Sequence, residues 1–382
     1  AARKSPRSPD SARRWGSGKQ PMPRLRDLGI TIGQYPPGPH NAITDVAGVL
    51  VGHTTLIYDQ PHVARTGVTV IVPREGEIWR DNCIAGFHAF NGCGEMTGIH
   101  WVKESGLLCS PIAITCTHQV GLVHEALVQY GAQREHAHDY IGALPVVAET
   151  WDGWLNDANA HPITHQHVFQ AMDAAQAGPV AEGSVGGGTG MICHDFKGGI
   201  GTSSRVVNTD DGAFVVGVLV QSNHGTREGL RVNGAPVGTL IGKDQIPLDW
   251  TEATDRSDAG SSIIIVISTD APLLPVQCNR LAQRATMGLA RTGGMGYNGS
   301  GDLFFCFSTG NHVSEYDTRA RQVRMLAHRQ LNALFEATAE AVEEAIINSL
   351  IAAETMTGYR GRTVYALPHD ALLHALAGYR RR

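Results

Sequence analysis

Two adjacent serines, Ser261 and Ser262, stand directly before the apolar run Ile263–Ile267, where self-cleavage chemistry is possible. An uninterrupted run of β-branched residues is typical of a buried strand, which holds its first residues rigidly. Gly260 just upstream tolerates unusual backbone angles. A serine hydroxyl here can attack the preceding carbonyl carbon, so that an ester replaces the amide. Hydrolysis then leaves a serine whose α-amine, with an ordinary pKa of about 7.7–8, can act as general base for its own hydroxyl. An ordinary turn before a strand is the alternative interpretation.

Three polar residues at other expected strand ends extend this chemistry. Asn223 follows the apolar segment Phe214–Gln221 and can present its amide as an oxyanion donor, or it can be a simple turn residue. Ser300 and Asp302 precede the expected strand Leu303–Phe307. Because alternate residues of a strand face the same side, these two can form a hydroxyl–carboxylate relay. Solvated polar groups in a hairpin turn are the alternative for this pair.

An acidic and aromatic segment, residues 149–157, is the candidate substrate wall. It holds two tryptophans and three carboxylates in nine residues. Trp154 can pack against a substrate, and Glu149 or Asp157 can bind an ammonium group. The same composition suits a turn that aromatic packing holds in place, and this alternative stays open.

Glycine-rich stretches predict close backbone packing around a site. Many of the 45 glycines fall within residues 183–201 and 288–301. No GxxxxGK[ST] motif is present, and no strand followed by a single helix frames the first run, so a nucleotide loop is a weak interpretation. Tight turns and close backbone approach explain the glycines better.

Composition narrows the classes of protein. The seven cysteines and eighteen histidines form no CxxC, no HExxH and no other metal-ligand spacing, so we expect no metal and no cofactor. Scattered cysteines predict free thiols in a reducing compartment, which suggests the cytoplasm. The net charge of −5 gives no reason to expect nucleic acid or an anionic membrane surface. No apolar run approaches the roughly 20 residues of a membrane span.

The elements that must position these residues mix strands and helices without strict alternation. With 382 residues and 42% hydrophobic content, the chain can bury a large core. Several expected strands are apolar on both faces, which predicts sheets covered on each side within one layered α/β domain. The expected strands are Val46–Val51, Val68–Val72, Ala85–Phe90, Leu107–Thr115, Ala143–Val147, Phe214–Gln221, Ile263–Ser268, Leu303–Phe307 and Thr363–Leu367. The expected helices are Val120–Tyr130, Val168–Ala177, Pro275–Ala290 and Arg319–Thr357.

The first 21 residues are rich in Arg, Lys, Ser and Pro and poor in hydrophobic residues. We expect a disordered basic extension. A transit peptide is the weaker interpretation, because Asp10 and the prolines do not fit it. Met22 is then a candidate for the native start.

Taken together, the segments resemble the L-aminopeptidase/D-esterase family, which includes the β-peptidyl aminopeptidases. The similarity runs from about Leu25 to Leu372, nearly the whole chain. Each motif is weak by itself, and their number and order carry the resemblance. They are GPHNAITDVAGV at 38–49, RTGV at 65–68, GSVG at 183–186, KGGIGTSSR at 197–205, TDAP at 269–272, ARTG at 290–293, NGSGD at 298–302 and GRTVYALP at 361–368.

The resemblance implies a fold and an activity. The fold is an αββα sandwich of the N-terminal-nucleophile-hydrolase type, spanning residues 22–382. The chain cuts itself into an α part ending at residue 261 and a β part over 262–382. The enzyme then removes N-terminal residues from short peptides, amides or esters, including D- or β-residues in some members. It needs no metal and usually assembles as a homo-oligomer of αβ units.

The resemblance also assigns roles to individual residues. Ser262 directly precedes the apolar strand and matches the nucleophile, although Ser261 stands where the family often has glycine and is the alternative nucleophile. Asn223 matches the oxyanion asparagine. Ser300 and Asp302 match the hydroxyl–acid pair beside the nucleophile's amine.

One departure from the family affects the expected turnover and substrate range. Trp154 replaces a tyrosine of the family's DGYLND-like segment, and an indole N–H differs in reach from a phenol hydroxyl. Two other functions remain open. One is an acyltransferase of the related ornithine acetyltransferase type, whose nucleophile is threonine; the other is an uncleaved, non-catalytic homologue.

Overall fold

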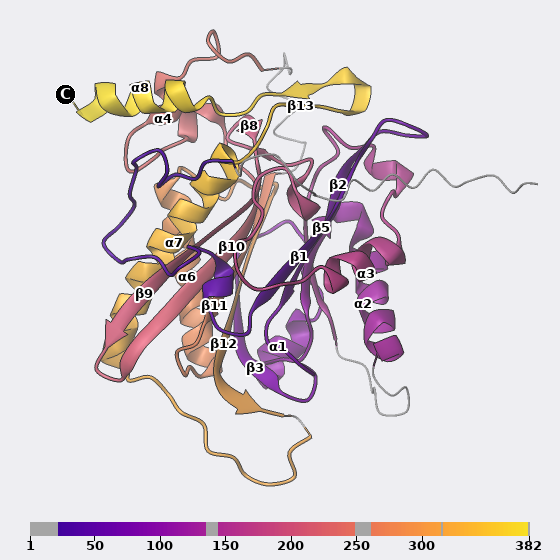
Figure 1. Ribbon diagram of the computed structural model, residues 1–382, viewed down its shortest axis with the longest axis vertical. Helices are drawn as coiled ribbons and strands as arrows, with labels where there is room; N and C mark the ends of the chain where they lie inside the picture. Colours follow the sequence, from indigo (N-terminus) through magenta and orange to yellow (C-terminus); the bar gives the residue numbers. More distant parts are fainter. Residues whose placement is uncertain (1–21, 135–143, 249–260, 315, 381–382) are drawn as a thin grey trace, which may run out of the picture.

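The computed structural model describes residues 22–134, 144–248, 261–314 and 316–380, and it shows two stacked sheets between two helical layers (Figure 1). This arrangement confirms the expected αββα sandwich. The small sheet has the order β1 (Leu50–Tyr58), β2 (Ala64–Val72), β5 (Ile112–Cys116), β6 (Val146–Thr150). The large sheet has the order β4 (Leu107–Leu108), β3 (Asn82–Gly92), β12 (Ser300–Val313), β11 (Ser261–Thr269), β10 (Gly212–Asn223), β9 (Gly199–Thr209).

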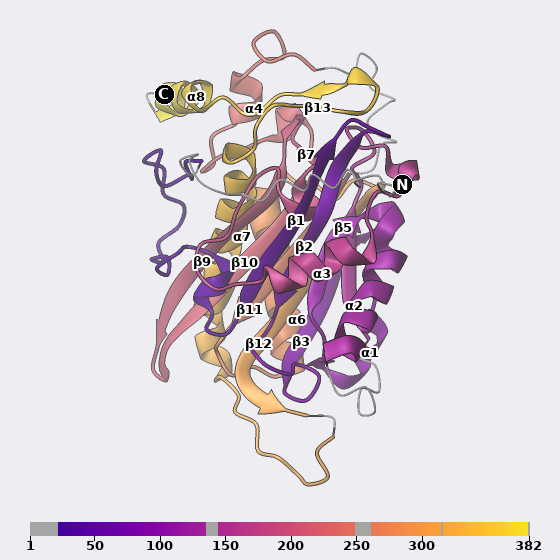
Figure 2. The same cartoon turned by 45° about the vertical axis from the view of Figure 1, so that its right-hand side comes forward.

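The helices cover the outer faces of both sheets. Figure 2 shows α2 (Val120–Arg134) and α3 (His165–Asp173) against the small sheet, while α6 (Pro275–Arg291) and α7 (Leu331–Ile351) lie against the large one. The remaining elements are α1 (Ile99–Ser105), α4 (Val237–Leu240), α8 (His369–Arg380), and the hairpins β7–β8 (Ile192–Cys193, Phe196–Lys197) and β13–β14 (Met356–Thr357, Thr363–Val364). Among the described residues, no helix has both the length and the apolar character that crossing a membrane requires.

Three buried apolar clusters fill the three interfaces between the layers. Strand β11 contributes to two of them, because alternate residues of a strand face opposite sides. Ile263, Ile265 and Ile267 pack toward α6 and α7. Ile264 and Val266 pack against the small sheet. This double burial explains why the strand is apolar throughout instead of alternating.

The longest expected helix, Arg319–Thr357, is too long at both ends. It begins at Leu331 and ends at Ile351. The polar stretch before it lacks an apolar stripe and binds back to β12 instead: the Arg324 N–H donates to Asn311 Oδ1, at 2.8 Å, and Asn311 Nδ2 donates to the Arg324 carbonyl, at 3.0 Å. Competition from this tertiary pairing is the physical reason for the error.

Smaller differences lie at the borders of elements. The helix expected over Val168–Ala177 ends at Asp173, and the strand expected from Val46 begins at Leu50 after a short 3₁₀ turn. Strand β9 and helices α1 and α8 were not expected. The basic extension 1–21 and the residues 258–260 before the two serines lie outside the described residues.

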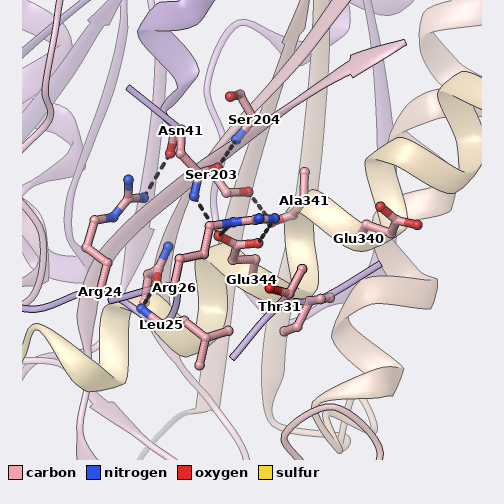
Figure 3. Close-up of polar contacts among 12 residues, drawn as sticks. Arg24, Leu25, Arg26, Thr31, Asn41, Ser203, Ser204, Glu340, Ala341 and Glu344 are labelled. Atoms are coloured by element: carbon pink, nitrogen blue, oxygen red, sulfur yellow. Dashed lines mark hydrogen bonds and ion pairs between the residues drawn. The ribbon is translucent and has the colours of Figure 1, made fainter. Parts of the chain in front are cut away.

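A buried ion network joins the N-terminal segment to α7 and β9 (Figure 3). Arg205 is fully buried and donates to Glu344 Oε2 at 2.7 Å and to Glu340 Oε2 at 3.2 Å. Arg26 adds a two-pronged contact to Glu344, at 2.8 and 2.9 Å. Burial raises the pKa of Glu344, but the hydrogen bond from Arg26 and the charges of Arg205 and Arg26 outweigh it and hold this pKa below its usual value.

Replacement of Arg205 by methionine is expected to destabilise the fold by about 3–5 kcal/mol, because it removes the cation that pairs with Glu340 and leaves Arg26 as the remaining partner of the buried Glu344. Arg321→Met is the matched control: its pair with Asp317 is exposed, and such pairs contribute about 0–1 kcal/mol. Urea unfolding of both variants gives the comparison. Equal losses of stability would contradict the prediction.

Candidate active site

The four candidate catalytic residues lie at neighbouring strand ends of the large sheet. The antiparallel pairing of β10 with β11 places Asn223 opposite Ser262. The parallel pairing of β11 with β12 places Ser261 opposite Ser300 and Ser262 opposite Gly301. Residues that are about 40 to 80 positions apart in the sequence therefore meet at one edge of the sheet, where β10 ends and where β11 and β12 begin.

The two serines point to opposite faces of the sheet. Ser262 shares its side with Ile264 and Val266, which face the small sheet, and its register partner Asn223 faces the same way. Ser261, Ser300 and Asp302 share the other side, toward the helices, with Ile263 and Phe304. The peptide bond between Ser261 and Ser262 therefore joins a residue on the helix-facing side to a residue on the side that faces the small sheet.

The Ser262 hydroxyl is buried and held by the backbone. The side chain is only 4% exposed, and the N–H of Gly301 donates to its Oγ at 3.1 Å. On the other face, Ser300 Oγ donates to Asp302 Oδ1 at 2.7 Å and lies 3.4 Å from Ser261 Oγ. The hydroxyl–carboxylate pair that alternation on the strand predicts is thus present in the structure.

Asp302 is a buried carboxyl group with a shifted titration. Burial raises its pKa to about 6, against hydrogen bonds from Ser300 and from the Ile263 backbone that favour the ionised form. Its Oδ2 atom is buried and has no hydrogen-bond partner among the described residues. A carboxylate with an unused oxygen on the strand beside Ser262 and Ile263 can accept a hydrogen bond from an amine.

The orientation of Asn223 is fixed by one backbone donor. The N–H of Ile192, in strand β7, donates to Asn223 Oδ1 at 2.8 Å. This bond assigns the oxygen to one side and turns the amide nitrogen, the donor atom, to the other. Asn223 is 4% exposed, so its donor acts in a largely water-excluded place, where such groups stabilise charge best.

Glu149 is the last but one residue of strand β6, and its carboxylate lies close to Gly94, in the loop that packs on Gly301. Its Oε1 accepts from the Glu95 N–H at 3.0 Å, and Thr117 donates to its Oε2. Burial raises its pKa. A methyl group placed on Gly94 would lie 3.0 Å from Gly301 Cα and 3.1 Å from Glu149 Oε1. The loop that holds Gly94 therefore lies between the Glu149 carboxylate and Gly301, the residue whose N–H binds Ser262 Oγ.

The other two candidate substrate residues differ in their positions. Trp154 packs in a small cluster with Ile192, the residue that orients Asn223, and the guanidinium of Arg362 stacks on its ring at 3.9 Å. Asp157 lies beside the turn between β1 and β2, where its N–H donates to the Val63 carbonyl at 3.0 Å. Within the described parts of the chain, no hydrogen bond or ion pair joins Asp157 to the serines or to Asn223, whereas Glu149 lies near the loop that packs on Gly301.

Several functional contacts were not predicted from the sequence. The N–H groups of Gly301 and Ile192, and the Thr117 hydroxyl on Glu149, come from segments distant in sequence. A fourth is Lys197, whose buried Nζ donates to the carbonyls of Met191 and Gly198 at 2.9 and 2.7 Å. Burial lowers the pKa of this lysine to about 7. Tertiary packing brings these groups together, and no local motif signals it.

The chain is similar to known peptidases over nearly its whole length. Residues 41–364 match the sequence model of peptidase family S58. The β-peptidyl aminopeptidase BapA of Sphingosinicella microcystinivorans is 45% identical over 379 residues, which is 96% of this chain and 95% of that protein.

Two solved structures share the fold over nearly the whole chain. A β-aminopeptidase of Burkholderia sp. has a TM-score of 0.86 at 49% identity, covering 93% of this chain and 98% of the other. The L-aminopeptidase D-Ala-esterase/amidase of Ochrobactrum anthropi, described as a prototype for the serine aminopeptidases and a variant of the Ntn hydrolase fold, has a TM-score of 0.86 at 43% identity. It covers 94% of this chain and 99% of the other.

Proposed function

The chain belongs to peptidase family S58, and we propose that it cleaves its own backbone between Ser261 and Ser262 to create the nucleophile of a serine aminopeptidase. Membership of the family makes the protein an aminopeptidase-type hydrolase with an Ntn fold, as expected from the sequence. The self-cleavage and the individual roles below are the proposal. The cleavage would divide one αββα unit over 22–382 into an α part ending at 261 and a β part beginning at 262.

The first step is an acyl shift within the chain. Ser262 Oγ attacks the carbonyl carbon of Ser261, the C–N bond to Ser262 breaks, and the nitrogen takes the hydroxyl proton. An ester now joins Ser261 to the Ser262 oxygen. Water hydrolyses this ester, giving a carboxylate on Ser261 and a free α-amine on Ser262.

The second step uses the new amine in turnover. The α-amine takes the Ser262 hydroxyl proton while the oxygen attacks the substrate carbonyl, and Asn223 donates to the developing oxyanion. Ser300 and Asp302 hold the amine on the helix-facing side. The amine passes its proton to the leaving nitrogen or oxygen, and water then hydrolyses the acyl-enzyme.

The observation that carries this proposal is the face that each serine occupies. Ser262 shares a side with Asn223, the proposed oxyanion donor, while the residue before it, Ser261, shares the other side with Ser300 and Asp302. Ser261 points away from Asn223 and instead contacts Ser300 Oγ at 3.4 Å. Cleavage after Ser261 would clear the position beside Ser300 for the new amine, which favours Ser262 over Ser261 as nucleophile.

The substrate is proposed to be a short peptide, amide or ester with a free amino terminus. Glu149 supports this choice, because a buried carboxylate on the loop beside Gly301 can bind an ammonium group. A relative named a β-peptidyl aminopeptidase and another named an L-aminopeptidase D-Ala-esterase/amidase suggest that β- or D-residues are accepted. An acyltransferase activity receives no support from these relatives.

The assembly and location are further parts of the proposal. We expect a homo-oligomer of αβ units, as in the family, and no role for nucleic acid or membrane. A cytoplasmic location is proposed because all seven cysteines are free thiols.

Intact-mass spectrometry of the denatured, purified protein tests the proposal directly. We expect two fragments, with the smaller one beginning at Ser262. A smaller fragment that begins at Ser261 would transfer the nucleophile role to that residue. A single full-length chain would refute self-processing and favour an uncleaved homologue.

A pH dependence follows from Asp302. Its pKa of about 6 means that the carboxyl group is neutral at lower pH and cannot stabilise the Ser262 nitrogen as this atom gains a proton during cleavage. We expect the rate of self-cleavage to fall about tenfold per pH unit below pH 6. Turnover requires an unprotonated α-amine, because this amine accepts the Ser262 hydroxyl proton. The acid limb of turnover should therefore follow the amine, whose ordinary pKa is about 7.7–8, and lie at higher pH than that of self-cleavage.

The control is Asp302→Asn, which should remove the acid limb of self-cleavage along with most of the activity. The effect on folding has the opposite sign, since the raised pKa favours the neutral form in the folded state. The stabilising contribution is therefore complete below the ordinary value of 3.8 and is lost as pH rises through about 6. Identical acid limbs for both reactions would contradict the assignment.

A further inference from the structure

A second cluster of reactive side chains lies next to Asn223, the proposed oxyanion donor. Cys193 ends β7, His194 follows it in the turn to β8, and His224 follows Asn223 at the end of β10. All three side chains are buried, at 0%, 0% and 2% exposure. One potential ligand atom from each, the sulfur and one nitrogen of each ring, lies within 4.8 Å of the other two.

The backbone is shaped to bring the His194 ring into this interior position. His194 and Asp195 have φ values of 49° and 61°, the left-handed conformation that residues other than glycine seldom adopt. Gly225 has a φ of 80° and packs so closely on His194 that a methyl group there would lie 2.4 Å from its ring. Strain of this kind, on the order of 1–3 kcal/mol per residue, persists only where the surrounding structure enforces it.

The hydrogen bonds of the two histidines suit ligation. His194 Nδ1 lies 2.9 Å from the carbonyl oxygen of Thr226. Since a carbonyl can only accept, Nδ1 carries the proton, and the lone pair is on Nε2. A second bond of this type, from the ring N–H to a backbone carbonyl, is usual for histidines that bind metal. His224 Nδ1 faces Cys193 Sγ at 3.9 Å, and its Nε2 has no hydrogen-bond partner among the described residues.

The spacing of the ligand atoms fits a metal ion. Metal–sulfur and metal–nitrogen bonds of about 2.3 and 2.0–2.1 Å place sulfur and nitrogen ligands roughly 3.5–3.8 Å apart at tetrahedral or trigonal angles. The 3.9 Å between Cys193 Sγ and His224 Nδ1 is close to this range. Only small side-chain movements would close the cluster around an ion.

We propose that Cys193, His194 and His224 form a binding site for one thiophilic transition-metal ion. One thiol and two imidazoles are the donor set of Zn²⁺ and of copper. On binding, the thiol proton leaves to solvent, and the thiolate and the two ring lone pairs form the metal bonds. No electron transfer is involved, and the proposal does not depend on the self-cleavage chemistry.

The charges around the site favour Cu⁺ over Zn²⁺. Lys197 is fully buried, is close enough to Cys193 to interact with it electrostatically, and donates to the backbone carbonyls of Gly188, Met191 and Gly198. Arg227 is also buried nearby and donates to the Asp195 carbonyl at 3.0 Å. A monovalent ion with one thiolate leaves the local charge unchanged. Zn²⁺ instead adds a positive charge beside Arg227, which is protonated at neutral pH, and beside Lys197, which burial leaves partly protonated.

The site would couple metal binding to the position of Asn223. Ile192, the donor to Asn223 Oδ1, precedes Cys193, and the His194 N–H donates to the His224 carbonyl at 2.7 Å. An ion held by both segments ties the orienting donor and the oxyanion donor together. It takes no part in bond making or breaking in the substrate.

Anaerobic titration with Cu⁺ in competition with a chromophoric chelator tests the proposal. We expect one equivalent of Cu⁺ per chain, bound at least about 100-fold more tightly than in Cys193→Ser. The His194→Asn variant should lose binding to a similar degree, and asparagine tolerates the left-handed backbone there, which preserves the fold. Zn²⁺ added in the same assay should bind more weakly than Cu⁺.

Cys93→Ser is the matched control, since Cys93 is the exposed cysteine among the seven and the obvious place for adventitious binding. Its stoichiometry and affinity should equal those of the unaltered protein. A Cu⁺-dependent rise in melting temperature, present in Cys93→Ser and absent in Cys193→Ser, provides a readout independent of activity. No tight binding, binding unchanged in Cys193→Ser, or binding lost in Cys93→Ser would each overturn the proposal. Tighter binding of Zn²⁺ than of Cu⁺ would overturn the choice of ion.

Discussion

Ser262→Ala is expected to yield a single full-length chain with no measurable aminopeptidase activity. The substitution removes the oxygen that attacks the Ser261 carbonyl, and therefore also the amine that cleavage would release. Loss of a nucleophile that acts as a unit with its base lowers kcat by on the order of 10⁶. Because the alanine side chain is smaller and Gly301 N–H loses only one acceptor, the fold should persist. Denatured-mass analysis and a rate assay with a chromogenic amino-acid amide measure both effects.

The matched control is Ser261→Ala, which changes the neighbouring hydroxyl on the opposite face of the strand. Among the described residues, the Ser261 hydroxyl has one hydrogen-bond contact, from Ser300 Oγ at 3.4 Å. The proposed cleavage makes Ser261 the last residue of the α part. We expect complete self-cleavage and turnover within about threefold of the unaltered enzyme. The reverse pattern, an inert Ser261→Ala and an active Ser262→Ala, would identify Ser261 as the nucleophile.

The fold could be predicted to a large extent because its strands carry strong local signals. Ile263–Ile267 is apolar on both faces, which requires a central strand covered on each side, and the structure places it as β11 in the middle of the larger sheet. Helix Pro275–Arg291 has an apolar stripe at regular spacing and a proline at its start, so its prediction was right within one residue. The prediction of a helix over residues 319–330 was wrong, because tertiary hydrogen bonds with Asn311 hold this segment in another conformation.

The site was predictable in part for the same reason. The Ser300–Asp302 contact follows from alternation on one strand, which the sequence alone displays. Pairing between strands is different, because the opposition of Asn223 to Ser262 depends on register across β10 and β11. The Cys193–His194–His224 cluster is the clearest case. Its members show no metal spacing in the sequence and meet only because a strained hairpin folds against a strand end.

Asn223 provides the second large effect, and two substitutions separate its catalytic role from its structural one. Asn223→Ala removes the amide donor and also leaves the Ile192 N–H without its acceptor. Loss of an oxyanion donor costs about 10²–10³ in kcat, and the unpaired buried N–H costs about 1–3 kcal/mol of stability. We expect both changes in this variant, with KM altered by less than about threefold.

Asn223→Asp keeps an acceptor oxygen for the Ile192 N–H and is nearly identical in size. If Asn223 only supports the backbone, this variant should retain both stability and turnover. If its N–H₂ group faces the oxyanion, the variant should be at least as impaired as alanine, because a carboxylate repels the developing negative charge. We expect the second result, with kcat lower than in Asn223→Ala. Asn208→Ala, which changes an exposed asparagine on β9, is the matched control. We expect its kcat to be unaltered, so that the loss of turnover can be assigned to Asn223.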